Sequence, residues 1–419
     1  MTLEEMGKQA RQSSRLLMQA ATQKKDSALR AIANHLWAER DAILEANRLD
    51  VKAASLAGLS AALIDRLTLN EPRLSGIIAD LNNVASLPDP VGERFEETTL
   101  PNGLQVHKQR VPLGVLAVIY EARPNVTIDV AGLALKSGNA AILRGGSETL
   151  NSNRALVSVI RRGLEENGLP PDAIQFIDDP DRARVAELLK LYEYVDMVIP
   201  RGGAALHKYC RENSLIPVIT GGIGICHLFV DESADQSAAL PVIRNAKIQR
   251  PTVCNALDTV LVHQKVAAGF IPQIVSQLSK DGVTFRVDPV AMRIMADYRQ
   301  DGVLPAGPAD FDTEWLSLVL GIKVVTGLDE AIAHITTHST GHSDGILTAD
   351  EANARRFIAE IDSAVVYVNA STRFTDGGQL GLGAEVAIST QRLQARGPMG
   401  LRELTTYKWV VQGDYHIRD

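Results

Sequence analysis

Short apolar runs alternate with segments of helical length from residue 113 onwards, and this alternation restricts the possible folds more than any other feature of the chain. The runs recur about 20 to 40 residues apart. They cover residues 113–120, 140–143, 174–177, 195–199 and 216–219. Strands that are apolar throughout, with helices between them, predict a parallel sheet covered on both faces. Because such crossovers are right-handed, we expect a doubly wound domain of Rossmann type.

A second alternation begins after residue 230. Its candidate strands are residues 259–262, 284–287, 322–325, 345–347 and 364–368, and its candidate helices are residues 267–278, 328–337 and 350–361. The chain has 419 residues, which is too long for one hydrophobic core. The predicted fold class is therefore α/β, with two tandem doubly wound domains.

The first hundred residues are predicted to be helical, with Asp26 as the N-cap of a helix whose apolar face includes Leu29 and Ile32. Two further segments, residues 103–111 and 406–412, read as exposed strands. An unpaired edge strand is a liability, so we expect these two to pair with each other or with another subunit. The predicted division is a cofactor-binding domain (1–98 and 113–226), a catalytic domain (227–390) and a small β oligomerisation element (99–112 and 391–419).

Composition excludes several classes of function. The formal net charge is −7 and no long basic run offsets it, which argues against a nucleic-acid partner. No stretch of about 18 apolar residues exists to span a membrane, and the first residues lack an apolar signal core. The three cysteines cannot all pair with one another, which fits a reducing cytoplasm.

Cys254 is the candidate nucleophile. Unlike Cys210 and Cys226, it lies in a segment rich in polar and turn residues, with Arg250 just before it. A nearby cation favours the thiolate, which is the reactive form of cysteine. The alternative is that Cys254 is a buried small hydrophobe, as most free cysteines are.

Two Arg-Gly-Gly turns follow predicted strands and open predicted helices. Their residues are Arg144, Gly145, Gly146 and Ser147 in the first turn, and Arg201, Gly202 and Gly203 in the second. Glycines let the backbone approach a ligand, and free amides at a helix start attract phosphate. Each turn could be only a tight turn, but two in one sheet favour a dinucleotide site. A third glycine turn, which contains Gly222, could bind cofactor or act as a hinge.

Other polar side chains are candidates for substrate recognition. Asn125 could donate its amide to an oxyanion formed when a thiolate attacks a carbonyl, or could serve only as a turn residue after Pro124. Arg123, Arg250 and Arg373 could bind an anionic substrate or could simply be solvated. We expect no metal, because the cysteines and histidines lack paired ligand spacing.

Segments from both halves of the chain resemble the aldehyde dehydrogenase superfamily, and within it the branch that reduces acyl phosphates. They are residues 115–127, 201–207, 216–226, 246–255, 328–346 and 367–385. The resemblance implies that NADPH reduces L-glutamate 5-phosphate to L-glutamate 5-semialdehyde in proline biosynthesis, with release of phosphate. It also implies a homo-oligomer in the cytoplasm, with a possible complex with the upstream glutamate kinase.

The resemblance assigns roles to individual residues. Cys254 would attack the acyl phosphate to form a thioester, and Asn125 would match the oxyanion-hole asparagine. Arg144 would lie near the adenosine ribose, and Glu314 would hold the nicotinamide ribose. Ile219 stands where aldehyde-oxidising relatives carry a glutamate that activates water, so water attack on the thioester should be slow.

Two alternatives stay open at this stage. One is a related dehydrogenase that forms a CoA thioester or oxidises an aldehyde. The other is a non-catalytic nucleotide-binding scaffold on the same fold.

Overall fold

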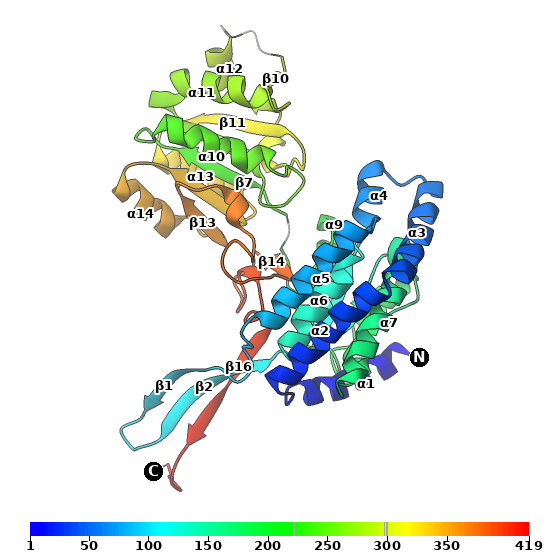
Figure 1. Cartoon of the computed structure of the whole chain (residues 1–419). Helices are drawn as coiled ribbons and strands as arrows, with labels where there is room; N and C mark the ends of the chain where they lie inside the picture. Colours follow the sequence, from blue (N-terminus) through cyan, green and yellow to red (C-terminus); the bar gives the residue numbers. More distant parts are fainter. Residues whose placement is uncertain (222, 297, 299–300, 419) are drawn as a thin grey trace. The chain divides into compact units, whose positions relative to one another are not determined.

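The computed structural model describes residues 1–221, 223–296, 298 and 301–418, except the side chain of Ala62. The chain forms two compact units (Figure 1). Unit 1 comprises Met1–Thr220, Gly381–Ala387 and Met399–Asp419, and unit 2 comprises Gly221–Leu380 and Ile388–Pro398. Within the described ranges, no helix is both long enough and apolar enough to cross a membrane.

Unit 1 contains a four-stranded parallel sheet in the order β5-β4-β3-β6. Its strands are β3 (Val115–Tyr120), β4 (Ala140–Arg144), β5 (Ile174–Phe176) and β6 (Met197–Arg201). Alternate residues of β3, such as Val115 and Ala117, pack with α1 and α8 on one face. On the other face, the hydroxyl of Tyr120 bonds to Thr127 of α6. The sheet is therefore covered on both sides, which confirms the predicted doubly wound class.

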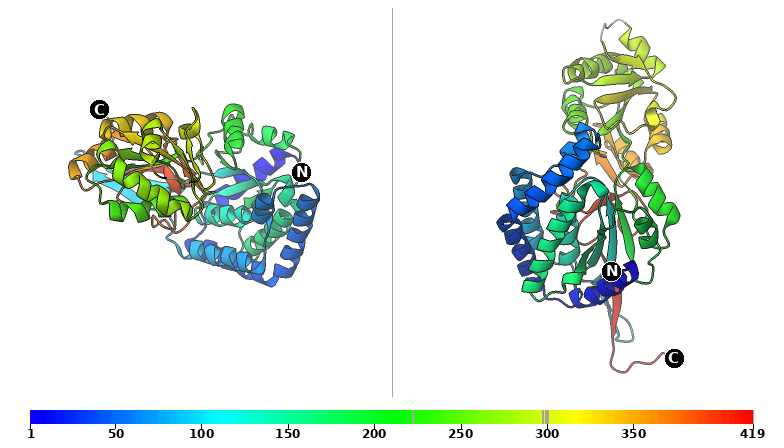
Figure 2. Two further views of the ribbon diagram at one scale, coloured as in Figure 1. Left: turned by 90° about the horizontal axis from the view of Figure 1, so that it is seen from above. Right: turned by 90° about the vertical axis from the view of Figure 1, so that its right-hand side faces the viewer.

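Helices α2, α3 and α5 pack around α7 and α6 in unit 1 (Figures 1 and 2). The α-helices of this unit are α1 (Leu3–Leu17), α2 (Thr22–Ala38), α3 (Arg40–Leu56), α4 (Ala61–Leu67), α5 (Glu71–Ser86), α6 (Asn125–Lys136), α7 (Leu150–Glu166), α8 (Ala183–Leu188) and α9 (Ala204–Asn213). The predicted N-cap was wrong: α2 starts after Ala21, and Asp26 lies within it. There its carboxylate forms an ion pair with the buried Lys136, which explains an acidic residue at that position.

The predicted strand at 216–219 was also wrong. This segment makes only an isolated bridge, between Val218 and Val198 of β6. Pro217 lacks an N–H and cannot donate in a ladder, which disfavours a regular strand.

Unit 2 contains a seven-stranded parallel sheet in the order β10-β9-β11-β8-β7-β12-β13. Its strands are β7 (Cys226–Val230), β8 (Leu257–His263), β9 (Thr284–Val287), β10 (Val303–Pro305), β11 (Val319–Val325), β12 (Ser343–Leu347) and β13 (Val365–Val368). Its helices are α10 (Gln236–Ile248), α11 (Gln264–Ser279), α12 (Pro289–Met295), α13 (Leu328–His338) and α14 (Glu351–Glu360). The strand β7 was not predicted, although it lies inside the sheet.

Alternate residues of the central strands of unit 2 belong to two separate cores. Leu228 of β7 packs with α10, α11 and α12, whereas its neighbour Phe229 packs with α13 and α14. Burial on both faces explains why these strands are apolar throughout.

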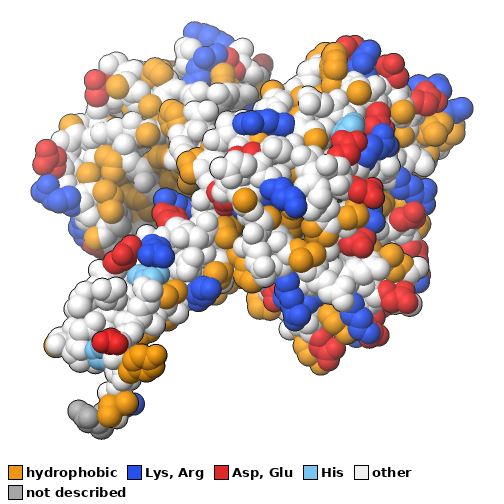
Figure 3. All heavy atoms as spheres, turned by 60° about the horizontal axis from the view of Figure 1, so that its bottom comes forward, with side chains coloured by type: hydrophobic (Ala, Val, Ile, Leu, Met, Phe, Trp, Pro, Cys, Tyr) orange, Lys and Arg blue, Asp and Glu red, His pale blue; other side chains and the backbone are white. Residues whose placement is uncertain are grey.

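A separate antiparallel sheet in unit 1 has the order β1-β2-β16. It comprises β1 (Arg94–Thr99), β2 (Gln105–Pro112) and β16 (Thr405–Gln412). The pairing of β2 with β16, in which Lys108 lies opposite Trp409, confirms that the two predicted exposed strands pair with each other. Apolar side chains reach the surface along this sheet (Figure 3), and Trp409 is 58% exposed.

The remaining elements are short. β14 (Ala387–Ser389) and β15 (Gly397–Met399) form a two-stranded sheet. The 3-10 helices are η1 (Ser147–Thr149), η2 (Pro171–Ala173), η3 (Asp310–Asp312) and η4 (Thr372–Phe374).

Candidate active site

Cys254 lies in the loop that connects α10 to β8 and is half-buried. The loop is closed at its base, because Nζ of the buried Lys247 donates to the carbonyl of Leu257 over 2.9 Å. The Sγ of Cys226, the first residue of β7, donates to the carbonyl of Cys254 over 3.2 Å. Cys254 and Cys226 therefore lie where the strands β8 and β7 begin, at the amino ends of the parallel sheet.

The backbone at Gly224 lies very close to the backbone of Cys254. A Cβ added to Gly224 would lie 1.5 Å from the carbonyl oxygen of Cys254, so only glycine fits there. The amide of Gly224 donates to Oε1 of Glu314 over 2.9 Å. The structure thus connects Glu314 to the Cys254 loop through a single residue. Gly222, the other predicted cofactor residue of this unit, lies outside the described residues.

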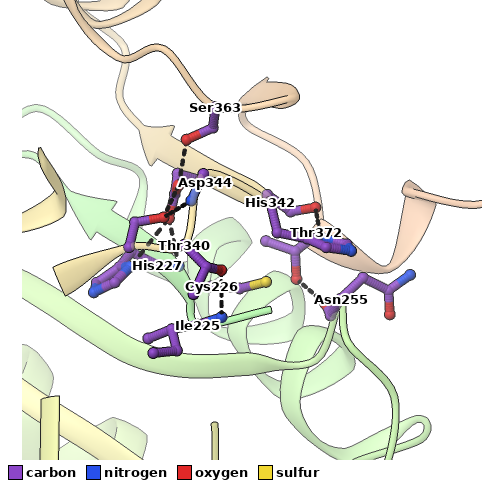
Figure 4. Close-up of polar contacts among 12 residues, drawn as sticks. Ile225, Cys226, His227, Asn255, Thr340, His342, Asp344, Ser363 and Thr372 are labelled. Atoms are coloured by element: carbon purple, nitrogen blue, oxygen red, sulfur yellow. Dashed lines mark hydrogen bonds and ion pairs between the residues drawn. The ribbon is translucent and has the colours of Figure 1, made fainter. Parts of the chain in front are cut away.

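Asn255 joins the loop of Cys254 to the segment that carries Arg373. Nδ2 of Asn255 donates to the carbonyl of Thr375 over 2.9 Å. The hydroxyl of Thr372 donates to the carbonyl of Asn255 over 2.7 Å (Figure 4). The guanidinium of Arg373 donates through Nε to Gln249 over 3.0 Å. Sequence reasoning did not identify Asn255 or Thr372 as part of the site.

Arg373, a predicted substrate-binding arginine of unit 2, lies near Cys254 and near a second such arginine, Arg250. Burial lowers the pKa of Arg373, and the positive charge of Arg250 lowers it further. Cys254 has the opposite effect on this pKa, so its thiolate and the Arg373 guanidinium attract each other. A cation near a thiol favours the thiolate, and two neighbouring guanidinium groups suit an anionic substrate.

A buried polar network lies behind this site (Figure 4). Both Nδ1 and the backbone amide of His227 bond to Oδ1 of Asp344, over 3.0 and 2.9 Å. The hydroxyls of Ser339 and Ser363 donate to its other oxygen. With four donors, Asp344 is a satisfied buried carboxylate, and it ties β7 to β12 and to the start of β13.

A second series of buried hydrogen bonds holds Thr375, two residues after Arg373. Nδ1 of His342 bonds to the hydroxyl of Ser343 over 2.8 Å, and Ser343 bonds to the hydroxyl of Thr375 over 2.6 Å. The hydroxyl of Tyr367 bonds to the same oxygen of Thr375 over 2.7 Å. Complete burial lowers the pKa of His342 to about 4, so its ring is neutral near pH 7. The sequence analysis placed His342 and Ser343 only within residues 328–346, one of the segments that carry the resemblance.

In unit 1, the first Arg-Gly-Gly turn follows β4 as predicted. The buried Arg144 donates to the carbonyl of Gly145 over 2.7 Å and to that of Pro180 over 2.8 Å, while its Nε has no partner among the described atoms. Burial lowers its pKa. A Cβ at Gly145 would lie 2.2 Å from Nδ2 of Asn153, which accounts for the glycine. Ser147 follows and is exposed.

A carboxylate lies beside each of the two turns, and neither carboxylate was predicted from the sequence. Oε1 of Glu148 accepts from the amide of Ala122 over 2.7 Å, and Oε2 of Glu121 accepts from the amide of Gly203 over 3.1 Å. Gly202 also lies close to the carboxylate of Glu121, since a Cβ on Gly202 would lie 2.5 Å from Oε2 of Glu121. The amide of Gly203, which we expected to bind phosphate, is thus already hydrogen-bonded to Glu121. A phosphate at this position must displace the carboxylate of Glu121.

Asn125 is the first residue of α6 and is half-buried. Its Nδ2 donates to Oδ2 of Asp129, one helical turn later, over 2.9 Å. The exposed Arg123 precedes it in the same turn, and Arg201 ends β6 in the same unit. In the part of the chain that the structure describes, no three His, Cys, Asp or Glu side chains gather so as to hold a metal ion.

The chain is similar to known proteins over nearly its whole length. The model of the aldehyde dehydrogenase family matches residues 2–289. Gamma-glutamyl phosphate reductase of Aeromonas salmonicida is 59% identical over 417 residues, covering 100% of both chains. The same enzyme from Roseiflexus castenholzii is 58% identical over 420 residues, covering 99% of both chains.

A solved structure extends the likeness to three dimensions. The crystal structure of gamma-glutamyl phosphate reductase from Thermotoga maritima is 51% identical in sequence, with a TM-score of 0.96. The alignment covers 99% of this chain and 99% of that one.

Proposed function

We propose a set of catalytic roles from the premise that this chain belongs to the aldehyde dehydrogenase family and, within it, to the gamma-glutamyl phosphate reductases. The chain is an oxidoreductase that reduces L-glutamate 5-phosphate to L-glutamate 5-semialdehyde with release of phosphate, a step of proline biosynthesis. The nicotinamide cofactor of the family, NAD(P), supplies the hydride when bound. The roles of the individual residues are the proposal.

Cys254 acts as the nucleophile in this proposal. Its thiolate attacks the carbonyl carbon of the acyl phosphate, and the C–O bond to phosphate breaks, which leaves a thioester on Sγ. A hydride added to the thioester carbon gives a tetrahedral intermediate, which collapses to the semialdehyde and regenerates the thiolate. The observation that supports this role best is the electrostatic attraction between Cys254 and the guanidinium of Arg373.

The substrate carries two anionic groups, and each can be matched to a cation. Arg250 is proposed to bind the phosphate that leaves, and Arg373 the α-carboxylate. Arg123 is a further anion-binding candidate. Arginine suits both roles, because its planar fork matches carboxylate and phosphate oxygens.

The charge that develops on the substrate oxygen is assigned to Asn125, which would donate its amide to it. Ile219 cannot act as a general base, so the thioester would persist until hydride arrives instead of being lost to water. This feature separates the proposal from an aldehyde-oxidising dehydrogenase.

For the cofactor we propose NADPH, bound by Arg144, Gly145, Gly146 and Ser147, by Arg201, Gly202 and Gly203, and by Gly222 and Glu314. The orphaned, buried Nε of Arg144 supports this choice, because a 2′-phosphate would give it a partner. Occupation of the second turn requires Glu121 to release the Gly203 amide.

We also propose assembly into a homo-oligomer, supported by the exposed Tyr407 and Trp409 on β16. A complex with the upstream glutamate kinase and a cytoplasmic location remain predictions. The alternatives of a CoA-dependent or aldehyde-oxidising dehydrogenase predict activity that does not need phosphate.

The test is an NADP-reduction assay with glutamate 5-semialdehyde and phosphate. The wild type should be active only when phosphate is present, and Cys254→Ala should be inactive. Cys210→Ala, a matched control at a buried cysteine of unit 1, should keep its activity. Equal activity of Cys254→Ala and the wild type would overturn the nucleophile assignment, and activity without phosphate would favour an alternative substrate class.

A further inference from the structure

Asp129 is the only hydrogen-bond acceptor that the described residues offer to the side-chain nitrogen of Asn125. The two residues lie one turn apart at the start of α6, and the bond runs from Nδ2 to Oδ2 over 2.9 Å. Asp129 is partly buried and forms no ion pair among the described residues, so its bond to Asn125 is the contact that accounts for a carboxylate at this position.

The chemistry of this pair is asymmetric. An asparagine amide carries a donor nitrogen at one end and an acceptor oxygen at the other, and the two ends have nearly the same shape. An ionised carboxylate can only accept. It therefore fixes Nδ2, not Oδ1, against itself and leaves the second hydrogen of that nitrogen for another acceptor.

The surroundings of Asp129 bear on its charge. Burial raises its pKa to about 6, the bond from Asn125 lowers it, the charge of Asp80 on α5 raises it, and that of Arg201 at the end of β6 lowers it. Above that value Asp129 is ionised and acts only as an acceptor.

We infer that Asp129 is a positioning residue, which holds the amide of Asn125 with a hydrogen directed at the oxygen of the reacting carbonyl. This inference rests on the oxyanion role proposed for Asn125. A positioning residue of this kind affects the transition state more than the ground state, so its loss lowers kcat with little change in KM.

The test is a double-mutant cycle in the reductive or oxidative assay. Asn125→Ala should lower kcat about 100- to 1,000-fold, the usual loss for an oxyanion donor. Asp129→Ala should lower kcat about 10- to 100-fold with both KM values within about twofold of the wild type. Asp129→Asn, which keeps an acceptor oxygen of the same shape, should restore much of that loss. In the Asn125→Ala background, Asp129→Ala should cause no further loss of kcat.

Controls separate this role from a structural one. Glu351→Ala removes an i,i+4 hydrogen bond to Arg355 on α14 and should leave kcat unchanged. Asp129→Ser replaces the alanine variant in the cycle if thermal melting shows that Asp129→Ala does not fold.

The possible outcomes are distinct. Equal losses from Asp129→Ala in both backgrounds would show that Asp129 stabilises the fold instead of acting through Asn125. A normal kcat for Asp129→Ala beside an impaired Asn125→Ala would overturn the inference alone. A normal kcat for Asn125→Ala would overturn the proposed oxyanion role and the inference together.

Discussion

The backbone of Gly224 lies directly against the carbonyl of Cys254, and a Cβ on Gly224 would lie 1.5 Å from that oxygen. The same glycine donates its amide to Glu314. The position of the Cys254 loop in unit 2 therefore depends on a residue that has no side chain, and any substitution there must move the loop.

Replacing Gly224 with alanine should abolish most of the activity. The added methyl group cannot fit unless the carbonyl of Cys254 moves, and overpacking of this kind costs about 1–3 kcal/mol of stability. The activity assay and a urea unfolding curve measure the two effects.

Gly269→Ala is the matched control, because nothing lies within 4 Å of its Cβ position in α11. That variant should keep its activity and gain about 0.5–1 kcal/mol of stability from higher helix propensity. An active Gly224→Ala protein would contradict the close approach.

Replacing Arg373 with glutamine should slow alkylation of Cys254 by iodoacetamide at pH 7 and raise the KM for the substrate. The guanidinium favours the thiolate, and glutamine is a polar but shorter side chain that carries no charge. Mass spectrometry of the alkylated peptide and steady-state kinetics report the two effects.

Arg355→Gln, which alters an exposed arginine of α14, serves as the control and should leave both measurements unchanged. Wild-type alkylation kinetics and KM in Arg373→Gln would refute the proposed role of this cation.

Replacing Glu121 with glutamine should tighten NADPH binding by about fivefold, which corresponds to about 1 kcal/mol. The carboxylate lies on the Gly203 amide and repels phosphate, whereas a glutamine oxygen can still accept the same bond without the charge. Fluorescence titration of the cofactor gives the dissociation constant.

Glu187→Gln on α8 removes a carboxylate that, among the described residues, pairs only with Arg184, and it should not change the dissociation constant. If Glu121→Gln binds NADPH as the wild type does, the second glycine turn does not receive phosphate.

The predictions from the sequence were most accurate where a local pattern of residue types determines the structure. Apolar strands such as β8 and β11 were predicted because burial on both faces leaves a continuous apolar run. The loop of Cys254 was predicted from its own polar and turn residues. Both features depend on residues that are close in sequence.

Contacts between distant residues could not be predicted in this way. Nothing in a Gly-Gly turn indicates that Glu121 folds back over Gly203, and nothing near Asn255 indicates its bonds to the Arg373 segment. The strand β7 was missed because Cys226–Val230 begins with Cys-His, so its first half lacks the apolar character of the other strands. His227 is tolerated there only because Asp344 accepts from it.

Replacing His342 with glutamine should flatten the pH dependence of stability between about pH 4 and pH 6.5. In the folded protein, burial lowers the pKa of His342 to about 4, whereas an unfolded histidine titrates near its ordinary 6.5. Between these values the unfolded chain binds the extra proton, so the wild type loses stability as the pH falls through this window, by up to about 3 kcal/mol from this group. Glutamine does not titrate and removes that loss.

Urea midpoints at pH 4.5 and pH 7 measure the difference, with the exposed His416→Gln as the control. Because buried carboxyls with raised pKa, such as Asp258, oppose the trend equally in both proteins, the comparison isolates His342. An unchanged slope in His342→Gln would mean that the imidazole accepts a proton without leaving its buried position.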